Sequence, residues 1–468
     1  MSSFSNFLVA VDDIVWGVPL IVAILLTGIL LTIRVKGLQF SKLGKAFQLM
    51  FQKDKESEGE VSSFAALCTA LSATIGTGNI VGVATAVVAG GPGALFWMWI
   101  AALFGMATKY AECTLAIHFR NVESDGHILG GPFYYIEKGM GKNFKWLAKL
   151  FAIFGVLAGL LGIGTITQVN GITSAAKVFF DPTNAHCISL FGKDYSLAIV
   201  ITGILVAICT ALVVIGGLKR ISKVSQIIVP FMAILYVVLG ILVLIFNITS
   251  IPAALKEIVL SAFGMRAAAG GALGAIIIAM QKGIARGIFS NEAGLGSAPI
   301  AAAAAKTNEP VEQGLVSMTG TFIDTIIICT ITGLAIVITG AYKVEGLEGA
   351  AVTIRAFQDA IPFAGSIIPF LMMLCLAFFA FTTILGWDYY SERCLEYAVN
   401  GKIGVVKTYR WLYLAAVLIG PYMTVSEVWT IADIFNGLMA LPNIIALIAL
   451  SGVTAKLTKD YIERKKRA

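Results

Sequence analysis

Two apolar stretches of this sequence carry glycines and polar residues near their middles, where backbone groups could bind a ligand. One contains Gly76-Thr77-Gly78-Asn79, and the other contains Met280 and Gln281 within residues 279–287. Glycine clusters weaken a helix and free backbone N–H and C=O groups. A freed N–H group can bind a carboxylate, and a freed carbonyl can bind a cation. Close helix packing is the alternative, because each stretch also contains a GxxxG pattern.

The composition indicates the solvent around these stretches. The 468 residues are 58% hydrophobic and 13% charged, whereas about a quarter of a soluble domain is charged. Lipid is therefore the expected solvent. The three histidines are far apart and the seven cysteines form no CxxC pair, so neither a metal site nor a disulfide framework is indicated. The sequence has no HExxH or GxSxG motif, so we do not expect an enzyme.

We predict an all-α integral membrane protein with about eleven transmembrane helices. A helix needs about 20 residues to span a bilayer, and backbone groups in lipid must be paired within their own segment. The alternating pattern of a membrane barrel is absent. The predicted spans are 14–35, 63–88, 91–119, 145–178, 194–216, 224–247, 268–304, 315–340, 364–392, 405–424 and 427–452.

The distribution of positive charge predicts an orientation for these spans. With the N-terminus outside, the segments that face the cytoplasm hold 26 of the 34 Lys and Arg residues, and the outside segments hold six. Cytoplasmic loops are enriched in Lys and Arg. We therefore expect a multi-pass protein of the plasma (inner) membrane, with the N-terminus outside and the C-terminus in the cytoplasm.

The two interrupted spans are the second and the seventh, five apart. Spans 2–6 and 7–11 then form two five-helix repeats with opposite orientation, each beginning with a broken helix. The expected units are an additional N-terminal transmembrane helix (1–40), the repeats (41–250 and 251–452) and a basic cytoplasmic tail (453–468). Broken helices at matching positions of inverted repeats indicate a secondary transporter with its site at mid-membrane. A channel is less well supported, because the chain lacks a ring of repeated pore segments.

A sixteen-residue run in the third span resembles the signature of a known family. The run is Gly-Gly-Pro-Gly-Ala-Leu-Phe-Trp-Met-Trp-Ile-Ala-Ala-Leu-Phe-Gly, at residues 90–105. Together with Gly76-Thr77-Gly78-Asn79, Gly130-Gly131-Pro132 and Ser290-Asn291-Glu292-Ala293-Gly294, it resembles the alanine/glycine:cation symporter family. The resemblance implies the leucine-transporter fold with one additional N-terminal helix. It also implies Na⁺-driven uptake of alanine and glycine, with H⁺ coupling in some members. The run itself is typical of a tight turn followed by aromatic anchors.

The substrate of that fold sits between the two broken helices and spans 4 and 9. By this resemblance, N–H groups near Gly76, Thr77 and Gly78 would bind the substrate carboxylate. The side chain of Asn79 could contact substrate or cation, or could cap the resumed helix. Gln168 of span 4 could contact substrate or join helices. Met280 and Gln281 are expected to flank the second break, where Gln281 could bind substrate or satisfy freed backbone groups.

The resemblance also implies a sodium site between spans 2 and 9. The hydroxyl groups of Thr382 and Thr383 would supply two oxygen ligands. Carbonyl groups of Ser72, Ile75 and Phe379 would complete the set of five. Hard cations prefer such oxygen ligands. The alternative is that each threonine hydroxyl bonds a carbonyl of its own helix.

Trp387 lies one helical turn beyond Thr383, on the same face of span 9. A bulky indole that projects into the pocket would limit substrate side chains to a hydrogen or a methyl group. The alternative is a tryptophan that faces lipid or the membrane interface. Thr383 and Trp387 are therefore both candidate substrate contacts.

Charged residues inside spans are costly and are functional suspects, at about 2.5–3.5 kcal/mol each at a helix centre. The deepest are Lys282, Arg286, Asp324 and Asp433. Lys282 and Arg286 share a helix face and could pair with Asp324 or with Glu112 to form a cytoplasmic gate.

These patterns predict a sodium-coupled symporter of alanine or glycine that works by alternating access. The alternative is a carrier of the same fold that is proton-coupled or takes another small neutral amino acid. The expected partners are that amino acid, co-transported sodium and membrane lipid. No nucleic acid is expected, and a monomer should suffice for function.

Overall fold

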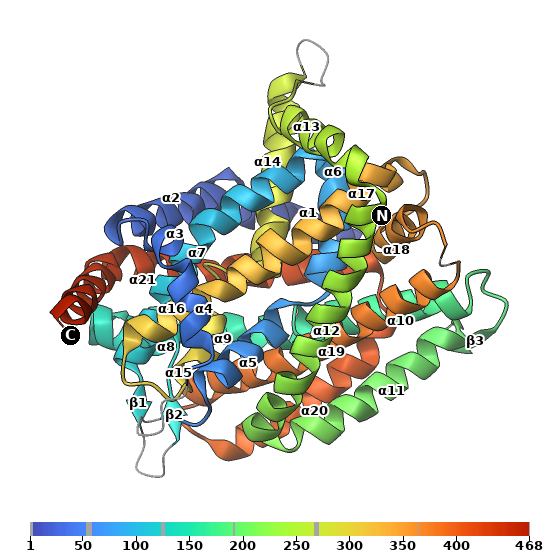
Figure 1. Cartoon of the computed structure of the whole chain (residues 1–468). Helices are drawn as coiled ribbons and strands as arrows, with labels where there is room; N and C mark the ends of the chain where they lie inside the picture. Colours follow the sequence, from blue (N-terminus) through green and yellow to red (C-terminus); the bar gives the residue numbers. More distant parts are fainter. Residues whose placement is uncertain are drawn as a thin grey trace.

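The computed structural model is a bundle of helices in which the two chain termini lie at opposite sides (Figure 1). It describes residues 3–52, 59–122, 127–190, 192–265, 271–363 and 365–467. Within these residues, ten helices are long and apolar enough to cross a membrane. An eleventh span is counted when the pair Ser63–Thr74 and Gly78–Gly90, bent by 50°, is taken as one. The prediction of about eleven transmembrane helices is confirmed.

The first span contains a bend and is followed by short helices. It comprises α1 (Ser3–Val15) and α2 (Val18–Arg34), and the chain then forms α3 (Leu38–Ser41) and α4 (Leu43–Met50). The indole Nε1 of Trp16, at the bend, donates a hydrogen bond to the backbone oxygen of Asp433 at 2.7 Å. This contact fixes the additional helix against the last helix of the bundle.

The next five spans begin with a broken helix. They comprise α5 (Ser63–Thr74), η1 (Gly78–Gly82) and α6 (Val83–Gly90); α7 (Gly93–Phe119); α9 (Lys145–Leu161) and α10 (Ile166–Phe180); α11 (Leu197–Val214); and α12 (Gly217–Phe246). The side chain of Ser62 caps α5, because its Oγ accepts the N–H of Ala65 at 3.1 Å. Span 4 is also interrupted, at residues 162–165, which the sequence analysis did not predict.

The last five spans also begin with a broken helix. They comprise α14 (Ala272–Asn291) and α15 (Ala298–Ala303); α16 (Pro310–Thr321), η5 (Phe322–Cys329) and α17 (Thr330–Thr339); α19 (Ile367–Ala398); α20 (Ile403–Ile419); and α21 (Val425–Arg467). Helix α21 continues to Arg467, so the predicted tail prolongs the last span. The repeat limits at 41–250 and 251–452 stay a prediction.

The connections are short helices and two hairpins. The helices are α8 (Pro132–Tyr135), η2 (Ile136–Met140), η3 (Lys142–Phe144), η4 (Ile248–Ser250), α13 (Ile251–Ala262), η6 (Ala341–Lys343), α18 (Ala350–Ala360) and η7 (Gly420–Tyr422). Strands β1 (Asn121–Val122) and β2 (Ile128–Leu129) are antiparallel, as are β3 (Cys187–Leu190) and β4 (Lys193–Ser196). In β3 and β4, Cys187 pairs with Ser196 and Leu190 with Lys193.

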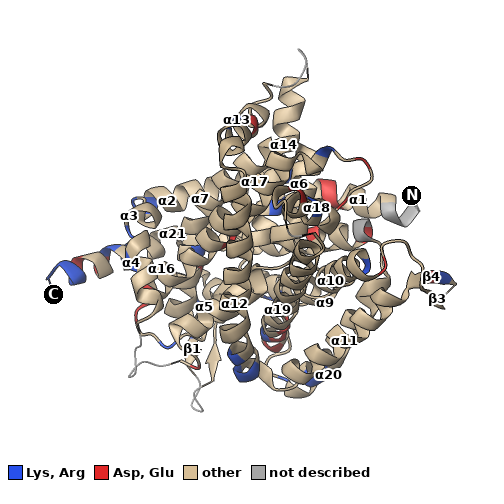
Figure 2. Cartoon of the chain, turned by 45° about the vertical axis from the view of Figure 1, so that its right-hand side comes forward, with Lys and Arg blue, Asp and Glu red and all other residues tan. Residues whose placement is uncertain are grey.

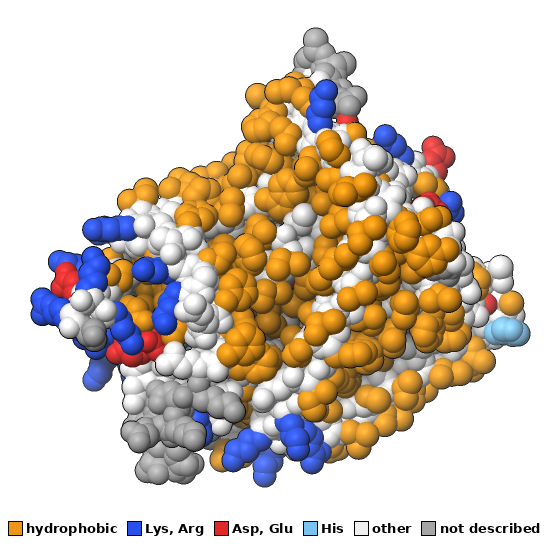
Figure 3. Space-filling view, viewed as in Figure 1, with side chains coloured by type: hydrophobic (Ala, Val, Ile, Leu, Met, Phe, Trp, Pro, Cys, Tyr) orange, Lys and Arg blue, Asp and Glu red, His pale blue; other side chains and the backbone are white. Residues whose placement is uncertain are grey.

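The surface matches a lipid environment. Hydrophobic side chains cover a broad face of the molecule (Figure 3). The exposed apolar residues of α11 and α12 include Leu212, Ile227 and Ile234, with 64–67% of their surface exposed. Lys and Arg gather at helix ends, for example at the C-terminal end of α21 and near the lower ends of α12 and α20 (Figure 2). Lipid can cover the apolar face while the charged ends remain in water.

The expected position of the second break is wrong. Residues 279–287 are continuous helix within α14, and the chain leaves the helix only after Asn291. Gly283 serves close packing, because a Cβ atom there would lie 2.2 Å from the backbone oxygen of Ala94 in α7. The packing alternative therefore explains this glycine. The true break follows, where Glu292, Gly294 and Gly296 have φ angles of +56°, +92° and +79°.

The first residues of the signature run (residues 90–105) set a backbone turn and the packing of α7. Gly91 has a φ of +70°, and a Cβ atom at Gly93 would lie 2.4 Å from the backbone nitrogen of Ala262 in α13. The indole Nε1 of Trp99 donates to Thr330 Oγ1 at 2.8 Å. The run thus forms a tight turn and holds α7 against α13 and α17.

Candidate functional site

The first break presents backbone N–H groups to side-chain oxygens. Helix α5 ends at Thr74 and η1 begins at Gly78. The N–H of Gly76 donates to Asn79 Oδ1 at 2.9 Å, and the N–H of Thr77 donates to Gln168 Oε1 at 3.1 Å. Asn79 therefore caps its own break, and Gln168 of α10 satisfies a freed donor. The N–H groups of Gly76 and Thr77, which were expected to bind a substrate carboxylate, are hydrogen-bonded to these two side chains in this structure.

Gly76 is the point of closest approach in this site. A Cβ atom there would lie 2.5 Å from Thr383 Oγ1 and 2.9 Å from Gln168 Oε1. Only glycine therefore lets the first broken helix contact α10 and α19 together. The adjacent Thr77 hydroxyl is buried and has no hydrogen-bond partner among the described residues. An unpaired buried hydroxyl is costly and is a candidate ligand contact.

Oxygen atoms of the predicted sodium site lie together beside this break. Thr383 Oγ1 lies 3.3 Å from the Ile75 carbonyl oxygen and 3.0 Å from the Phe379 carbonyl oxygen. Thr382 Oγ1 also donates to the Phe379 carbonyl, at 3.0 Å. Both threonines thus bond their own helix, as the alternative required, but Thr383 also contacts the first break. Ser72 lies in the last turn of α5 and is fully buried.

Asp324 joins the two broken helices. Its Oδ1 accepts from Asn79 Nδ2 at 2.6 Å, and the Ser290 hydroxyl lies 3.0 Å from each carboxylate oxygen. Thr325 Oγ1 donates to Asp324 Oδ2 at 2.7 Å. Asp324 lies in the wide turn η5, and no part of it is exposed. Its carboxylate and the surrounding hydroxyl oxygens are of the type that hard cations bind.

Two further carboxylates serve the second break. Glu112 Oε1 accepts the N–H groups of Gly294 and Gly296, both at 3.1 Å, and Asn443 Nδ2 at 2.6 Å. Glu292 accepts the Ser297 hydroxyl at 2.7 Å. The donors freed by this break are therefore capped by the protein's own carboxylate.

Trp387 contacts the second break through its N–H group. The indole Nε1 donates to Glu292 Oε1 at 2.7 Å, and the side chain is 1% exposed. The alternative in which Trp387 faces lipid is therefore wrong. The hydrogen bond fixes the ring between α19 and the residues that directly follow α14.

Among the described residues, the centre of the molecule holds more buried carboxyl groups than buried cationic side chains. Glu112, Glu292 and Asp324 have no exposed surface, and the buried Lys109, 3% exposed, is close enough to interact electrostatically with all three. Its Nζ has no hydrogen-bond partner among the described residues, and it lines a small cavity with Thr74 and Asn291. Buried charges are costly unless they are balanced. Bound cations or protons can supply the missing positive charge.

Met280 and Gln281 lie away from both breaks. Gln281 is ten residues before the end of α14, which is about 15 Å along a helix axis. It lines a cavity of about 80 Å³ with Asp12, Lys282 and Arg286. The expectation that these residues flank the second break is therefore wrong, and with it the reason for placing them at the substrate.

The predicted partners of Lys282 and Arg286 are also wrong. Arg286 Nη1 lies 2.7 Å from Asp433 Oδ1 of α21, not near Asp324 or Glu112. Its guanidinium also stacks 4.8 Å from the Trp429 ring centroid. Lys282 is exposed in the same cavity. This pair lies on the side of the N-terminal α1, so it does not form a gate on the C-terminal side.

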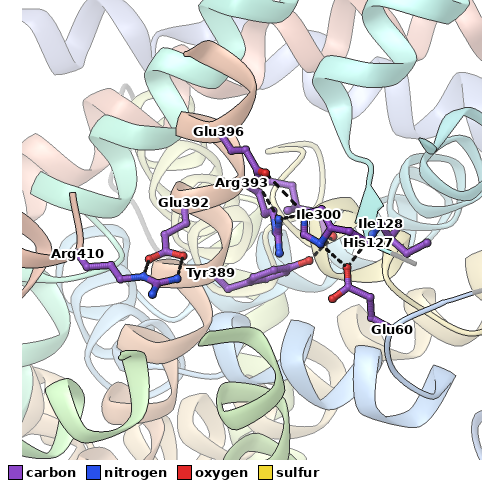
Figure 4. A network of polar contacts seen from close by, with 9 residues as sticks. All are labelled: Glu60, His127, Ile128, Ile300, Tyr389, Glu392, Arg393, Glu396 and Arg410. Carbon is purple, nitrogen blue, oxygen red and sulfur yellow. Dashed lines mark hydrogen bonds and ion pairs between the residues drawn. The ribbon is translucent and has the colours of Figure 1, made fainter. Parts of the chain in front are cut away.

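A second polar network joins Glu60, His127, Arg393 and Glu396 (Figure 4). His127 Nδ1 is 3.3 Å from Glu60 Oε1, and His127 Nε2 is 3.6 Å from Glu396 Oε1. Arg393 Nη1 contacts Glu396 Oε2 at 2.6 Å. Hydrogen bonds to Glu396 and Glu60 raise the pKa of His127 to about 9, against partial burial and the charge of Arg393. The network ties the segment before α5 to the end of α19.

Comparison with known proteins places this geometry in a family. The model of the sodium:alanine symporter family matches residues 1–468. The chain belongs to the sodium:alanine symporter family. It is 52% identical to an uncharacterized transporter of Haemophilus influenzae, over 99% of this chain and 97% of that protein. It is 47% identical to the sodium/alanine symporter AgcS of Methanococcus maripaludis, over 99% and 98% of the two chains.

A solved structure supports the fold. The crystal structure of MhsT in complex with L-phenylalanine matches with a TM-score of 0.54 and 15% identity, over 86% of this chain and 98% of MhsT. The predicted leucine-transporter fold is therefore confirmed. The chain is a multi-pass secondary amino-acid transporter and not an enzyme.

Several site residues of the transporter were missed or misassigned from sequence. Asp324 and Glu112 were noted as charged residues in apolar spans, but they were paired with Lys282 and Arg286 instead of with the residues of the two breaks. Glu292 and Lys109 were not singled out, although each is a charged residue within a predicted span. Intramembrane charge was the available signal. The hydrogen-bond partners of Glu112 and Glu292 depend on where the second helix is broken. GxxxG spacing alone does not distinguish a helix break from close helix packing.

Proposed function

We propose that this transporter imports alanine or glycine together with Na⁺ by alternating access. The observation that carries the proposal is the cluster of Thr383 Oγ1 with the carbonyl oxygens of Ile75 and Phe379, at 3.3 and 3.0 Å. These neutral oxygens lie where the first helix breaks, next to Gly76. A cation bound among them would hold α19 against the break, so its binding would favour the conformation that binds substrate.

The proposed substrate site follows from the same contacts. A substrate carboxylate would accept the N–H groups of Gly76 and Thr77, and the side-chain oxygens of Asn79 and Gln168 would give up these two donors. The Thr77 hydroxyl supplies a further donor. Trp387 and the close contact at Gly76 support a small substrate side chain, in keeping with alanine or glycine.

The proposed orientation places the N-terminus outside and the C-terminus in the cytoplasm. Arg286 and Asp433 then close the outer side, and the network of Glu60, His127, Arg393 and Glu396 closes the inner side. Substrate release to the cytoplasm would require the inner network to separate while the outer pair stays closed. A single chain contains all of these residues, which is consistent with a functional monomer.

Proton coupling is the second candidate, favoured by the buried Glu112, Glu292 and Asp324. These carboxylates could carry protons where a sodium symporter carries a second cation. Proteoliposomes with the purified chain test both candidates through uptake of labelled alanine. An inward Na⁺ gradient without a pH gradient should drive accumulation, and an equal K⁺ gradient should not. Accumulation driven by an inward H⁺ gradient in the absence of Na⁺ would instead support proton coupling.

A further inference from the structure

A cavity of about 390 Å³ lies at the C-terminal side of the molecule, away from the transport site. Its lining includes Lys42 and Lys45 of the α3–α4 segment, and Lys465 and Lys466 of α21. Apolar side chains, among them Leu38 and Leu315, form the rest of its wall. Figure 3 shows basic side chains around the C-terminal end with hydrophobic atoms between them.

The cavity carries positive charge that the described residues do not balance. Lys465 Nζ lies 3.3 Å from Glu312 Oε1, which also accepts the Tyr461 hydroxyl at 3.0 Å. Among the described residues, Lys42, Lys45 and Lys466 form no ion pair. The neighbouring acidic residue Glu309 is paired with Arg464 at 2.9 Å. Three ammonium groups therefore remain free to bind an anion.

The position of the cavity relative to the spans indicates the source of that anion. Helix α21 has 43 residues, or about 65 Å, so its end extends beyond a hydrocarbon core about 30 Å thick. The first span ends with α2 at Arg34, and helix α3 begins four residues later, at Leu38. Lys42 and Lys45 therefore lie just beyond the end of the first span, at the level of lipid headgroups, and the cavity brings the end of α21 beside them.

We infer that this cavity binds the headgroup of an anionic phospholipid from the leaflet on the C-terminal side. The phosphate contacts Lys42, Lys45 and Lys466, and an acyl chain lies along the apolar wall at the partly exposed Ile462. Basic pockets at this level typically bind anionic headgroups. A free phosphate ion would gain nothing from the apolar wall, so the combination favours a lipid. A bound lipid would join α3 and α4, which follow the additional helix, to the end of α21.

Native mass spectrometry of the detergent-purified full chain tests this inference, with dioleoyl phosphatidylglycerol and dioleoyl phosphatidylcholine as probes. The site variant combines Lys42→Gln, Lys45→Gln and Lys466→Gln. The control combines Lys219→Gln, Lys223→Gln and Lys402→Gln, which removes the same charge from other exposed positions on the proposed cytoplasmic side. Wild type and control should bind one phosphatidylglycerol more tightly than phosphatidylcholine. The site variant should lose at least tenfold in affinity for phosphatidylglycerol only, because each lysine near such a headgroup contributes about fivefold.

Two results would overturn the inference. One is equal loss of phosphatidylglycerol binding in the site variant and in the control, which would show a diffuse charge effect. The other is displacement of phosphatidylglycerol by glycerol 3-phosphate at similar concentration, which would show that the apolar wall contributes nothing. Thermal unfolding of each variant checks that it is folded. The single variant Lys466→Gln, at an exposed position near the chain end, provides a milder version that should lose about fivefold.

Discussion

At the scale of single residues, the site depends on oxygen atoms whose partners are now defined. Thr383 contacts both its own helix and the first break, whereas Thr382 shares the Phe379 carbonyl and lies 3.5 Å from Met232 Sδ. Thr383 is therefore the better-placed cation ligand of the two. Trp387 combines a large ring with a hydrogen bond to Glu292, so two effects must be separated in any variant at this position.

Replacing Thr383 by valine should raise the Na⁺ concentration for half-maximal alanine uptake at least tenfold. The substitution keeps the shape of the side chain but deletes the oxygen next to Ile75. Thr27→Val is a matched control, because that buried hydroxyl bonds only its own helix, at Ala23 O. Thr332 is unsuitable as a control since its hydroxyl donates to the Asn79 carbonyl at 2.8 Å. Unchanged Na⁺ dependence in a folded Thr383→Val protein would remove Thr383 from the cation site.

Replacing Trp387 by alanine should let valine and leucine compete with labelled alanine for uptake. Each buried methylene adds about 0.8 kcal/mol, or roughly fourfold in affinity, while lost packing should lower stability by about 3–5 kcal/mol. Trp387→Phe keeps a ring but deletes the donor to Glu292. If the phenylalanine variant admits valine and leucine as well as the alanine variant does, the hydrogen bond sets selectivity and ring size does not.

At the scale of elements, the broken helices show what could be predicted from sequence. The first break was located correctly because Gly76-Thr77-Gly78 places flexible residues next to a capping asparagine. The second was misplaced because Gly283 and Gly287 resemble a break but pack α14 against α7. The actual break combines Glu292 in a left-handed conformation, which composition does not signal, with Gly294 and Gly296, which are the same kind of signal as the glycines of the first break. Pairings such as Arg286 with Asp433 depend on how distant helices cross, and a single sequence does not contain that information.

The close contact at Gly76 can be tested with a neighbouring glycine as control. Gly76→Ala should abolish alanine uptake, because its Cβ atom would lie 2.5 Å from Thr383 Oγ1 and would separate α5 from α19. Gly82→Ala should transport nearly as wild type, since the nearest atom to its Cβ would be 3.8 Å away. Uptake by both variants in proteoliposomes, with expression and unfolding measured in parallel, checks this. Equal activity would mean that the first break does not need the contact with α19.

At the scale of the whole molecule, two polar closures lie on opposite sides of the broken helices. One joins Arg286 of α14 to Asp433 of α21, and the other joins Glu60, His127 and Glu396 across three segments. Alternating access requires that each can open while the other stays closed. Only the second contains a histidine, so protons on the proposed cytoplasmic side should act on one closure and not on the other.

The inner closure should therefore weaken as the pH rises. The pKa of His127 is raised from its ordinary value of 6.5 to about 9 by Glu396 and Glu60, so the folded protein binds this proton more tightly than the unfolded chain. That stabilisation is complete below pH 6.5 and is lost as the pH rises through about 9. His127→Gln should remove this pH-dependent step in thermal unfolding measured from pH 6 to 10. His186 is an exposed histidine between α10 and β3, and the His186→Gln variant should retain this step.

The same change should be visible in transport. In proteoliposomes with a fixed Na⁺ gradient, the wild type should release alanine faster when the internal pH is raised from 7 to 9. The reason is that the imidazole of His127 then loses the charge that pairs with Glu60 and Glu396. A parallel pH response in the His127→Gln protein would show that another group controls the inner side.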